Sequence, residues 1–200
     1  MGPKVSTATS PEYKALIADY EALEEHTEAG TTVLRHKRTG QHALLHEYTF
    51  NEQRDYDKQV DWLNARKERL IASRHLCQLE RVITYKEEQY CSTSYKIYAL
   101  MGWSHRNLRE EVASRSQKGE KVGENELWDV LNCSVPTLAF LQKQSIKHQA
   151  ITSQSILKRP EGGWQLYDPQ LAGVQSNYDT ISNQRSSKQV YLSPELAHAL

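Results

Sequence analysis

The sequence predicts an α+β fold in which a strand-rich first half is followed by a more helical second half. Residues 32–34 and 43–45 are apolar arms on either side of a polar turn at residues 37–41, a pattern typical of an antiparallel strand pair. Residues 51–74 contain neither Gly nor Pro and carry apolar residues near one helical face, which predicts a helix. Leucines at helical spacing predict a second, longer helix over residues 126–143.

The remaining elements are predicted from shorter patterns. Apolar residues at mixed spacing make helix and strand compete over residues 13–23. Ser104 is expected to cap a helix that runs through Val112, and Pro136 is expected to kink the long helix. Strands are expected at residues 79–85 and 95–101, with two short strands at residues 156–157 and 164–167.

Composition limits the classes of protein to which the chain can belong. Its 200 residues carry 25 basic and 25 acidic side chains, so no global charge recruits nucleic acid or an anionic membrane. An apolar fraction of 38% leaves room for a modest core and a large polar surface. Cys77, Cys91 and Cys133 are odd in number and far apart, which predicts neither a zinc site nor a disulfide framework. We expect a cytoplasmic protein without a membrane span or a secretory signal.

Several segments follow the order in which protein kinases arrange their motifs. The kinase catalytic loop reads H-R-D-L-x-x-x-N, and His148-Gln149-Ala150-Ile151-Thr152-Ser153-Gln154-Ser155 has the same frame. The chain therefore resembles the protein-kinase family over about residues 13–200. Four further segments carry the resemblance: Thr39-Gly40-Gln41-His42-Ala43-Leu44-Leu45-His46 for the V-A-I-K strand, Lys96-Ile97-Tyr98-Ala99-Leu100-Met101-Gly102-Trp103 for the hinge, Asp168-Pro169-Gln170 for D-F-G, and Ser193-Pro194-Glu195 for A-P-E.

The resemblance implies a two-lobed fold. Its N-lobe would be an antiparallel sheet plus one helix at residues 13–103, after a tail at residues 1–12. A partial helical C-lobe would occupy residues 104–200, with an activation-segment-like stretch at residues 168–196, and would end after the A-P-E-like motif. The chain is thus expected to be a C-terminally truncated kinase-like protein whose uncovered apolar helix faces bind a partner.

The chemistry that the kinase motifs provide is replaced at most matching positions. His46 stands for the phosphate-pairing lysine, Ala150 for the catalytic aspartate and Ser155 for the metal-binding asparagine. The glycine-rich loop falls at residues 24–29, which contain no glycine and three glutamates. Asp168 keeps the magnesium position, although a lone carboxylate there is better explained as a turn acid.

The remaining residues that match kinase motif positions are assigned structural roles or lack a clear counterpart. Met101 would be the gatekeeper, Glu195 the A-P-E glutamate, and His148 a packing residue together with Ile151. The helix glutamate expected near position 65 is missing, and Glu68 could replace it if the helix register shifts. No catalytic residue, cofactor site or metal site is therefore assigned.

The leading functional expectation is a pseudokinase that is a structural subunit of a large cytoskeletal assembly, for example the microtubules of the ciliary axoneme. Its partners would be proteins such as tubulin, with neither nucleic acid nor membrane involved. The alternatives are a nucleotide-binding pseudokinase that regulates a partner enzyme and an atypical active kinase. A thermal-shift titration with ATP and magnesium separates the first two.

Smaller clusters are given their simplest interpretations. The histidines at positions 36, 42 and 46 are interpreted as a solvated strand face rather than a metal site. The basic turn at residues 35–38 is interpreted as a solvated hairpin tip, although it could contact an acidic surface. Cys133 is expected to be a buried small apolar residue. The N-terminal Gly2-Pro3-Lys4-Val5-Ser6 matches a loose myristoylation pattern, for which a plain tail is favoured.

Overall fold

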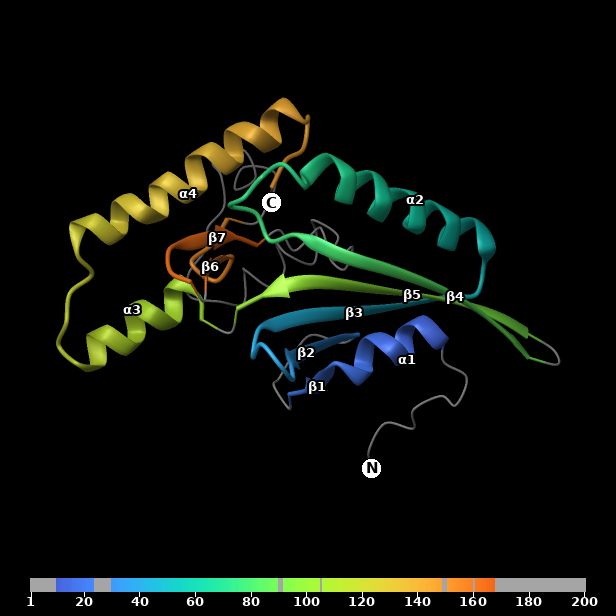
Figure 1. The fold of residues 1–200 in the computed structure, drawn as a ribbon. Coiled ribbons are helices and arrows are strands. Elements are labelled where there is room, and N and C mark those ends of the chain that lie inside the picture. The colour runs from blue at the N-terminus through green and yellow to red at the C-terminus, as the bar shows by residue number, and fades with distance from the viewer. Residues whose placement is uncertain are drawn as a thin grey trace, which may run out of the picture. The chain divides into compact units, whose positions relative to one another are not determined.

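The structure is a computed structural model that describes residues 10–23, 30–89, 92–104, 106–148, 151–159 and 161–167. These residues form an α+β fold with four helices, a five-stranded antiparallel sheet and a two-stranded sheet (Figure 1). The chain divides into two compact units. The first unit comprises Met1–Ala72 and Cys77–His105, and the second comprises Ser73–Leu76 and Arg106–Leu200. None of the described helices is long and apolar enough to cross a membrane.

The first unit is built on the five-stranded sheet, whose strand order is β1-β2-β3-β5-β4. The hairpin predicted around residues 37–41 is confirmed, because β2 and β3 pair antiparallel with Leu34 opposite Ala43. The strands and helices of this unit are β1 (Tyr20–Ala22), β2 (Thr31–His36), β3 (His42–Phe50), β4 (Leu79–Gln89), β5 (Ser92–Trp103), α1 (Pro11–Ala18) and α2 (Gln53–Leu70).

The two helices of the first unit pack on opposite faces of this sheet (Figure 1). Side chains alternate between the faces along each strand, so Ala43 and Leu45 of β3 point toward α1 and join a core cluster with Leu16 of that helix. Phe50 points the other way, and its ring lies 6.4 Å from that of Tyr56 in α2. We call these faces the α1 side and the α2 side.

Residues 13–23, whose spacing predicted neither a helix nor a strand clearly, contain parts of both. Pro11 occupies the first turn of α1, where its missing N–H costs no hydrogen bond, and the chain then forms β1 from Tyr20. The first unit therefore has two helices rather than the one that was expected. The expected strands at residues 79–85 and 95–101 are confirmed but longer, because β4 and β5 pair as far as Gln89 and Ser92.

The second unit combines two helices with a small sheet. Its elements are α3 (Leu108–Gln117), α4 (Glu124–Lys143), β6 (Ile156–Lys158) and β7 (Trp164–Leu166). β6 and β7 pair antiparallel, and Leu76 adds a parallel bridge to Leu166. The buried side of α4 includes Cys133, Thr137 and Leu141, and this helix packs against β7. The predicted burial of Cys133 is confirmed.

Two predictions about these helices are revised, namely that Ser104 caps α3 and that Pro136 kinks α4. Ser104 is buried but does not cap α3. The cap is Asn107, and α3 begins at Leu108. α4 continues through Pro136 to Lys143 as one helix, and the Thr137 hydroxyl next to the proline donates a 2.7 Å hydrogen bond to the carbonyl of Cys133.

Candidate functional site

His46 lies in the interior of the first unit and not on a solvated strand face. Its side chain is 2% exposed on the α2 side of β3, between Thr31 of β2 and Ala99 of β5. Neither ring nitrogen has a hydrogen-bond partner. Burial lowers the pKa of the imidazole to about 4, because the cation would lose its hydration. His46 is therefore neutral at pH 7 and offers no positive charge at the position where a kinase has its lysine.

The other two histidines of the expected row have different surroundings. His36 and His42 are half-buried at the ends of β2 and β3. His36 Nδ1 accepts hydrogen bonds of 3.2 Å from the backbone N–H groups of Arg38 and Thr39, so this histidine stabilises the turn. Among the described residues, no group of three or more His, Cys, Asp or Glu side chains could hold a metal ion.

The polar environment of His46 extends along the α2 side of the sheet. The ring of Tyr48 stacks on that of His46 with centroids 6.3 Å apart. The Tyr48 hydroxyl and the Gln59 side-chain nitrogen are also buried without a hydrogen-bond partner. Burial raises the pKa of Tyr48, which stays protonated. These side chains are neutral, so they provide no charge that could anchor a phosphate.

The helix glutamate is not recovered by a register shift. The buried side of α2 carries Leu63, Arg66 and Leu70, whereas Glu68 is exposed. The guanidinium carbon of Arg66 lies 5.0 Å from the centre of the Trp62 ring, within reach of a cation–π contact. α2 thus buries Arg66, and Ala65, at the position that the resemblance matches to the glutamate, is exposed.

Met101 has the environment of a core residue. It is fully buried in β5 opposite Leu44. β5 continues for two residues beyond it, to Trp103, so the hinge-like segment is still paired as a strand. Its position is compatible with a gatekeeper, but its visible role is packing on the α2 side of the sheet.

The catalytic-loop-like segment lies in the second unit. His148 is buried, and its Nε2 lies 3.0 Å from the carbonyl oxygen of Tyr167. The burial of His148 agrees with the packing role expected for it, whereas Ile151 is 45% exposed and does not have that role. Two positions in the kinase motifs, Ala150 and Asp168, lie outside the described residues, as do residues 24–29 and Glu195.

The hydroxyl of Ser155 is occupied within its own loop. It accepts a hydrogen bond from the Thr152 N–H and donates one to the Thr152 carbonyl oxygen, each at 2.9 Å. The Thr152 hydroxyl in turn accepts from the backbone N–H of Ser155 at 3.3 Å. Ser155 is buried, and its hydroxyl is already engaged as both a donor and an acceptor within this turn. Its visible role is to fix the turn that leads into β6.

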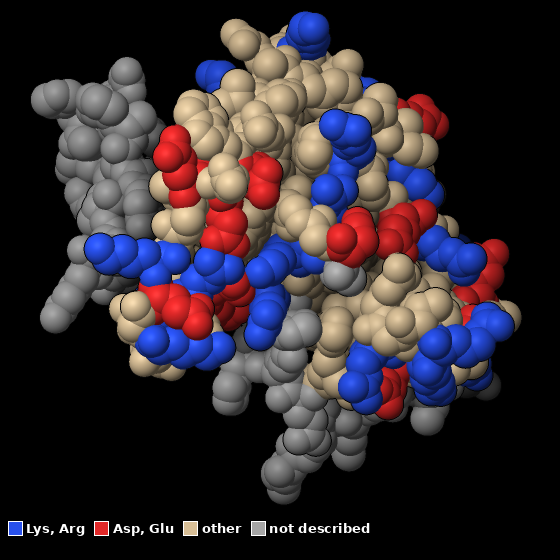
Figure 2. All heavy atoms as spheres, turned by 60° about the vertical axis from the view of Figure 1, so that its left-hand side comes forward, with Lys and Arg blue, Asp and Glu red and all other residues tan. Residues whose placement is uncertain are grey.

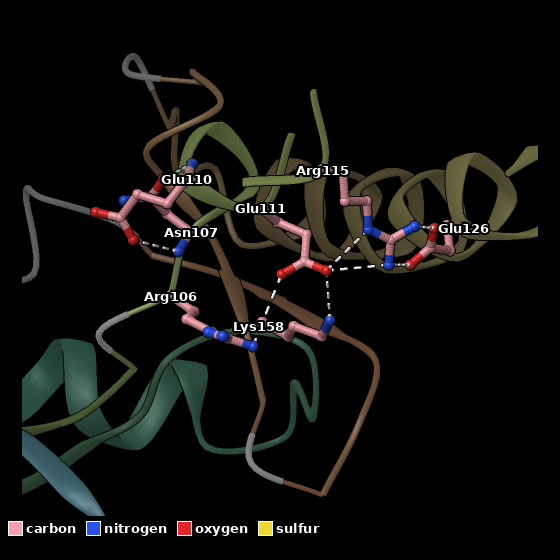
Figure 3. Close-up of polar contacts among 7 residues, drawn as sticks. All are labelled: Arg106, Asn107, Glu110, Glu111, Arg115, Glu126 and Lys158. Carbon is pink, nitrogen blue, oxygen red and sulfur yellow. Dashed lines mark hydrogen bonds and ion pairs between the residues drawn. The ribbon is translucent and has the colours of Figure 1, made fainter. Parts of the chain in front are cut away.

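A group of charges joins three elements of the second unit (Figure 3). Glu111 of α3 lies at its centre with its side chain 12% exposed. Its Oε1 is 3.0 Å from both Lys158 Nζ of β6 and Arg115 Nη2 of α3, and its Oε2 is 4.0 Å from Arg106 Nη1. The hydrogen bond from Lys158, with those from Arg115, lowers the pKa of Glu111 against the opposing effect of burial.

Arg115 extends this charge network to α4. Its guanidinium donates a 2.6 Å hydrogen bond to Glu126 Oε1 and contacts the second oxygen of the same carboxylate. Asn107 and Glu110 form a reciprocal capping box beside it, with Asn107 Oδ1 accepting from the Glu110 N–H at 3.0 Å (Figure 3). The convergence of these charges joins α3 to both α4 and β6. Lys158 is distant in sequence from Glu111, so helix spacing could not reveal it.

The basic turn at residues 35–38 is partly neutralised. Arg35 pairs with Glu21 across β1 and β2, and Lys37 Nζ donates a 2.6 Å hydrogen bond to the carbonyl of Ala18. Arg38 is exposed. Two of the three strong cations therefore tie the hairpin to neighbouring backbone and side chains, and a dense positive surface is not formed.

An apolar stripe lies on the outer face of α4. It consists of Leu127, Trp128, Leu131 and Val135, whose exposed fractions are 52%, 54%, 46% and 59%. These positions share a helix face distinct from the buried face that carries Cys133, Thr137 and Leu141. Figure 2, in which α3 and α4 are turned toward the viewer, shows a broad area without charged residues and acidic side chains along part of its border. We refer to these four residues as the α4 stripe.

The geometry thus contains two kinds of candidate site. The kinase-like positions that are described have packing or turn-forming roles, and the α4 stripe is an exposed apolar surface. No protein-family model matches the chain, and no curated protein is detectably similar to it.

Proposed function

We propose that this chain is a non-catalytic protein with a kinase-like architecture that works as a scaffold through protein contacts. The order of elements supports the architectural part of the proposal. After α1 and β1, which the expected series lacks, a strand pair, a long helix and two more strands are followed by two helices, a loop and a short strand pair. This later part of the order is the series expected from the kinase resemblance.

The observation that carries the scaffold role is the α4 stripe. Single exposed apolar side chains are common on protein surfaces, but contiguous ones usually mark an interaction site. Four such side chains occur within nine residues of one helix, and one is a tryptophan. Tryptophan is among the residues that contribute most to binding energy at protein interfaces. Covering this helix face with a partner would remove its apolar area from water.

The environments of His46 and Ser155 support the absence of phosphoryl transfer. Transfer depends on positioning and on positive charge around the phosphates. His46 is buried and neutral, the hydroxyl of Ser155 is bound to its own loop, and Glu68 of α2 is exposed. These environments support the proposal that the chain does not transfer phosphoryl groups.

A thermal-shift titration with ATP and magnesium tests this proposal. A ligand that binds only the folded state raises stability by RT ln(1 + [L]/Kd). We expect no shift at millimolar ATP. A saturable shift would favour the nucleotide-binding regulator instead. Phosphate transfer above background that is abolished by Asp168→Ala would overturn the proposal in favour of an active enzyme.

The proposed setting is a large cytoskeletal assembly, with the axonemal microtubule as the specific case. Co-sedimentation of the purified chain with stabilised microtubules tests it directly. We expect saturable binding that Leu131→Lys, a change in the α4 stripe, weakens. Co-sedimentation that is absent, or equally strong after that substitution, would remove the microtubule from the proposal and leave the scaffold role to be tested with other partners.

A further inference from the structure

We propose that Arg74, His75 and Arg159 form a binding site for a phosphate group, supplied by free phosphate or by a phosphorylated side chain. All three residues belong to the second unit. The inference does not rest on the proposed scaffold function. It depends on two buried N–H groups that lack an acceptor and on the positive charges beside them.

The three residues come together around the small sheet of the second unit. His75 lies directly beside β7, because its carbonyl oxygen accepts a 2.7 Å hydrogen bond from the N–H of Leu166. Arg159 follows β6, and its N–H donates a 3.0 Å hydrogen bond to the carbonyl of Gly163, the residue before β7. A Cβ atom at Gly163 would lie 3.0 Å from Arg159 Nη2. The glycine therefore leaves room for the guanidinium next to the start of β7.

The charge of Arg159 reaches the ring of His75. Burial lowers the pKa of this imidazole below its ordinary 6.5, and the positive charges of Arg74 and Arg159 lower it further, against an opposing effect of the Trp164 backbone. Burial also raises the pKa of the Cys133 thiol to about 11, an effect that the charge of Arg159 partly opposes. Cys133 Sγ is 3.9 Å from the His75 carbonyl oxygen. The guanidinium, the ring and the thiol therefore share one region.

Two N–H groups in this region have no acceptor among the described residues. Arg74 Nε donates a 3.0 Å hydrogen bond to His75 Nε2, so in the neutral ring the proton lies on Nδ1. His75 Nδ1 and Arg159 Nε are both buried without a hydrogen-bond partner. The nearby Trp164 backbone does not complete a hydrogen bond to Nδ1. A buried N–H without an acceptor is unfavourable, so a ligand with several acceptor oxygens would be stabilised here.

The charges around these donors are mainly positive. Arg159 Nη1 is 3.7 Å from Glu161 Oε1, but the side chain of Glu161 is 67% exposed, so this pair is weak. Arg74 is exposed and forms no ion pair with a described residue. Lys158, the neighbour of Arg159, is engaged by Glu111. Two guanidinium groups are thus accompanied by one exposed carboxylate, which leaves a local excess of positive charge for an anion.

This combination selects phosphate among the possible ligands. A metal cation would be repelled by the guanidinium groups, and a water molecule would not offset their charge. A carboxylate has one negative charge and two oxygens in a plane. A phosphate monoester has close to two negative charges at pH 7 and three acceptor oxygens, and arginine binds such oxygens in a bidentate manner. Donors that come from two separate segments of the chain fit the tetrahedral group better than the planar one.

The first experiment titrates the nitrogen-15-labelled chain with inorganic phosphate and with O-phosphoserine, at constant ionic strength set by chloride. We expect saturable binding, with a shift of the ring nitrogen signals of His75 as its Nδ1–H gains an acceptor. Acetate is the control for a planar anion and should bind about tenfold more weakly or less. Binding of both phosphate probes would assign the site to the phosphate group itself. Binding of only one probe would identify the source.

Four substitutions test where the anion binds. Arg159→Gln removes a guanidinium from the site and should weaken binding by about tenfold or more, and Arg74→Gln should weaken it as well. Arg109→Gln makes the same change in charge on the exposed surface of α3 and should alter binding by less than about twofold. Glu161→Gln removes the carboxylate beside Arg159 and should strengthen binding about twofold. Loss of folding cannot produce such a gain.

Three outcomes would overturn the inference. These are no saturable binding of either phosphate probe, equal binding of acetate, and equal losses for Arg159→Gln and Arg109→Gln. If the thermal midpoint without ligand shows that Arg159→Gln does not fold, Arg74→Gln and Glu161→Gln decide the question in its place.

The ATP titration that tests the proposed function is kept separate by one further variant, because ATP also carries phosphates. An ATP-dependent shift that disappears in Arg159→Gln would come from the phosphate site and support this inference. A shift that persists in that variant would report a nucleotide site elsewhere and count against the proposed function alone. The two ideas can therefore fail independently.

Discussion

The sheet of the first unit and the helix pair of the second unit are stabilised by different kinds of contact. The sheet buries apolar side chains on both faces, with α1 covering one and α2 packed on the other. In the second unit α3 has no buried residue, and charges on Glu111, Lys158 and Arg115 join it to its neighbours. One unit is organised around an apolar core, and the other depends substantially on polar contacts at its periphery.

The two units also differ in whether the apolar residues of their long helices are buried. Leu63 of α2 is fully buried, whereas Leu131 of α4 is 46% exposed. Apolar residues on α2 therefore stabilise the unit that contains them. Those on the α4 stripe contribute little to the isolated chain, and their energetic value would be realised when a partner covers them.

The largest effect is expected for Leu63→Ala, which leaves a cavity between α2 and the sheet. We expect a loss of about 3 kcal/mol in the free energy of unfolding of the first unit. Hydrogen exchange of the amides in β3 and β5 measures this loss locally, which is useful because two units need not unfold together. The exchange of these amides should accelerate throughout the sheet.

Leu131→Ala is the matched control, because it is the same chemical change on the α4 stripe. Its expected cost is below about 1 kcal/mol, in line with other exposed substitutions. Equal losses for the two variants would mean that the α4 stripe is already part of a core, and the contrast between the units would then disappear.

An effect of similar size is expected from protonation of His46. Its pKa falls from 6.5 to about 4 on folding, so the unfolded chain binds more protons than the folded chain between these values. The contribution of the neutral His46 ring to the free energy of unfolding is therefore fully present above pH 6.5. It is lost as the pH falls toward 4. The difference between the two pKa values corresponds to about 3 kcal/mol.

His46→Leu removes the titrating group and the two unpartnered nitrogens while retaining an apolar side chain in the site. The test compares wild type with this variant by hydrogen exchange in β3 between pH 6.5 and 4, because carboxylates contribute to both curves equally. The stability difference between the two proteins should grow as the pH falls. Parallel curves would show that folding does not lower the pKa of His46, for example because the protonated ring gains a hydrogen-bond partner.

An intermediate effect is expected for Glu111→Gln, which leaves Lys158 and Arg115 without their shared carboxylate. These side chains are only partly buried, so we expect a loss of about 1–2 kcal/mol, confined to the second unit. In wild type, the lowered pKa of Glu111 means that the contribution is present above the ordinary carboxyl range and is lost as the pH falls through the folded-state value.

Glu120→Gln serves as the control for this charge change, because Glu120 is exposed and forms no ion pair with a described residue. Hydrogen exchange in α3 and β6 should change for Glu111→Gln and not for Glu120→Gln. A similar response to both would mean that net charge, and not the contacts in Figure 3, determines the stability of this unit.

Much of the fold could be predicted because its signals are local. The polar turn at residues 37–41 specifies the β2–β3 hairpin, and a stretch without Gly or Pro specifies α2. The α+β class and the antiparallel sheet follow from such patterns. The mixed spacing at residues 13–23 was ambiguous because it contains α1 and the start of β1 in immediate succession.

The candidate sites were harder to predict because burial and charge convergence depend on distant residues. His46 is a polar residue that was interpreted as exposed, but it points to the α2 side of the sheet and is buried there. Lys158, which contacts Glu111, belongs to a strand that lies 47 residues further along the sequence. Burial of one side of α4 by β7 determines which leucines remain exposed, and the leucine spacing alone does not contain that information.

The start of α3 is a case in which the signal was present in the sequence and was missed. Asn107 is followed three residues later by Glu110, which is the pattern of a capping box. Asn107→Ala removes the side-chain acceptor of the Glu110 N–H and should cost about 1 kcal/mol. Asn107→Ser retains a capping oxygen and should restore most of that loss. Hydrogen exchange in the first turn of α3 distinguishes the two variants, and equal exchange in both would show that contacts of Glu111, rather than the cap, fix the start of this helix.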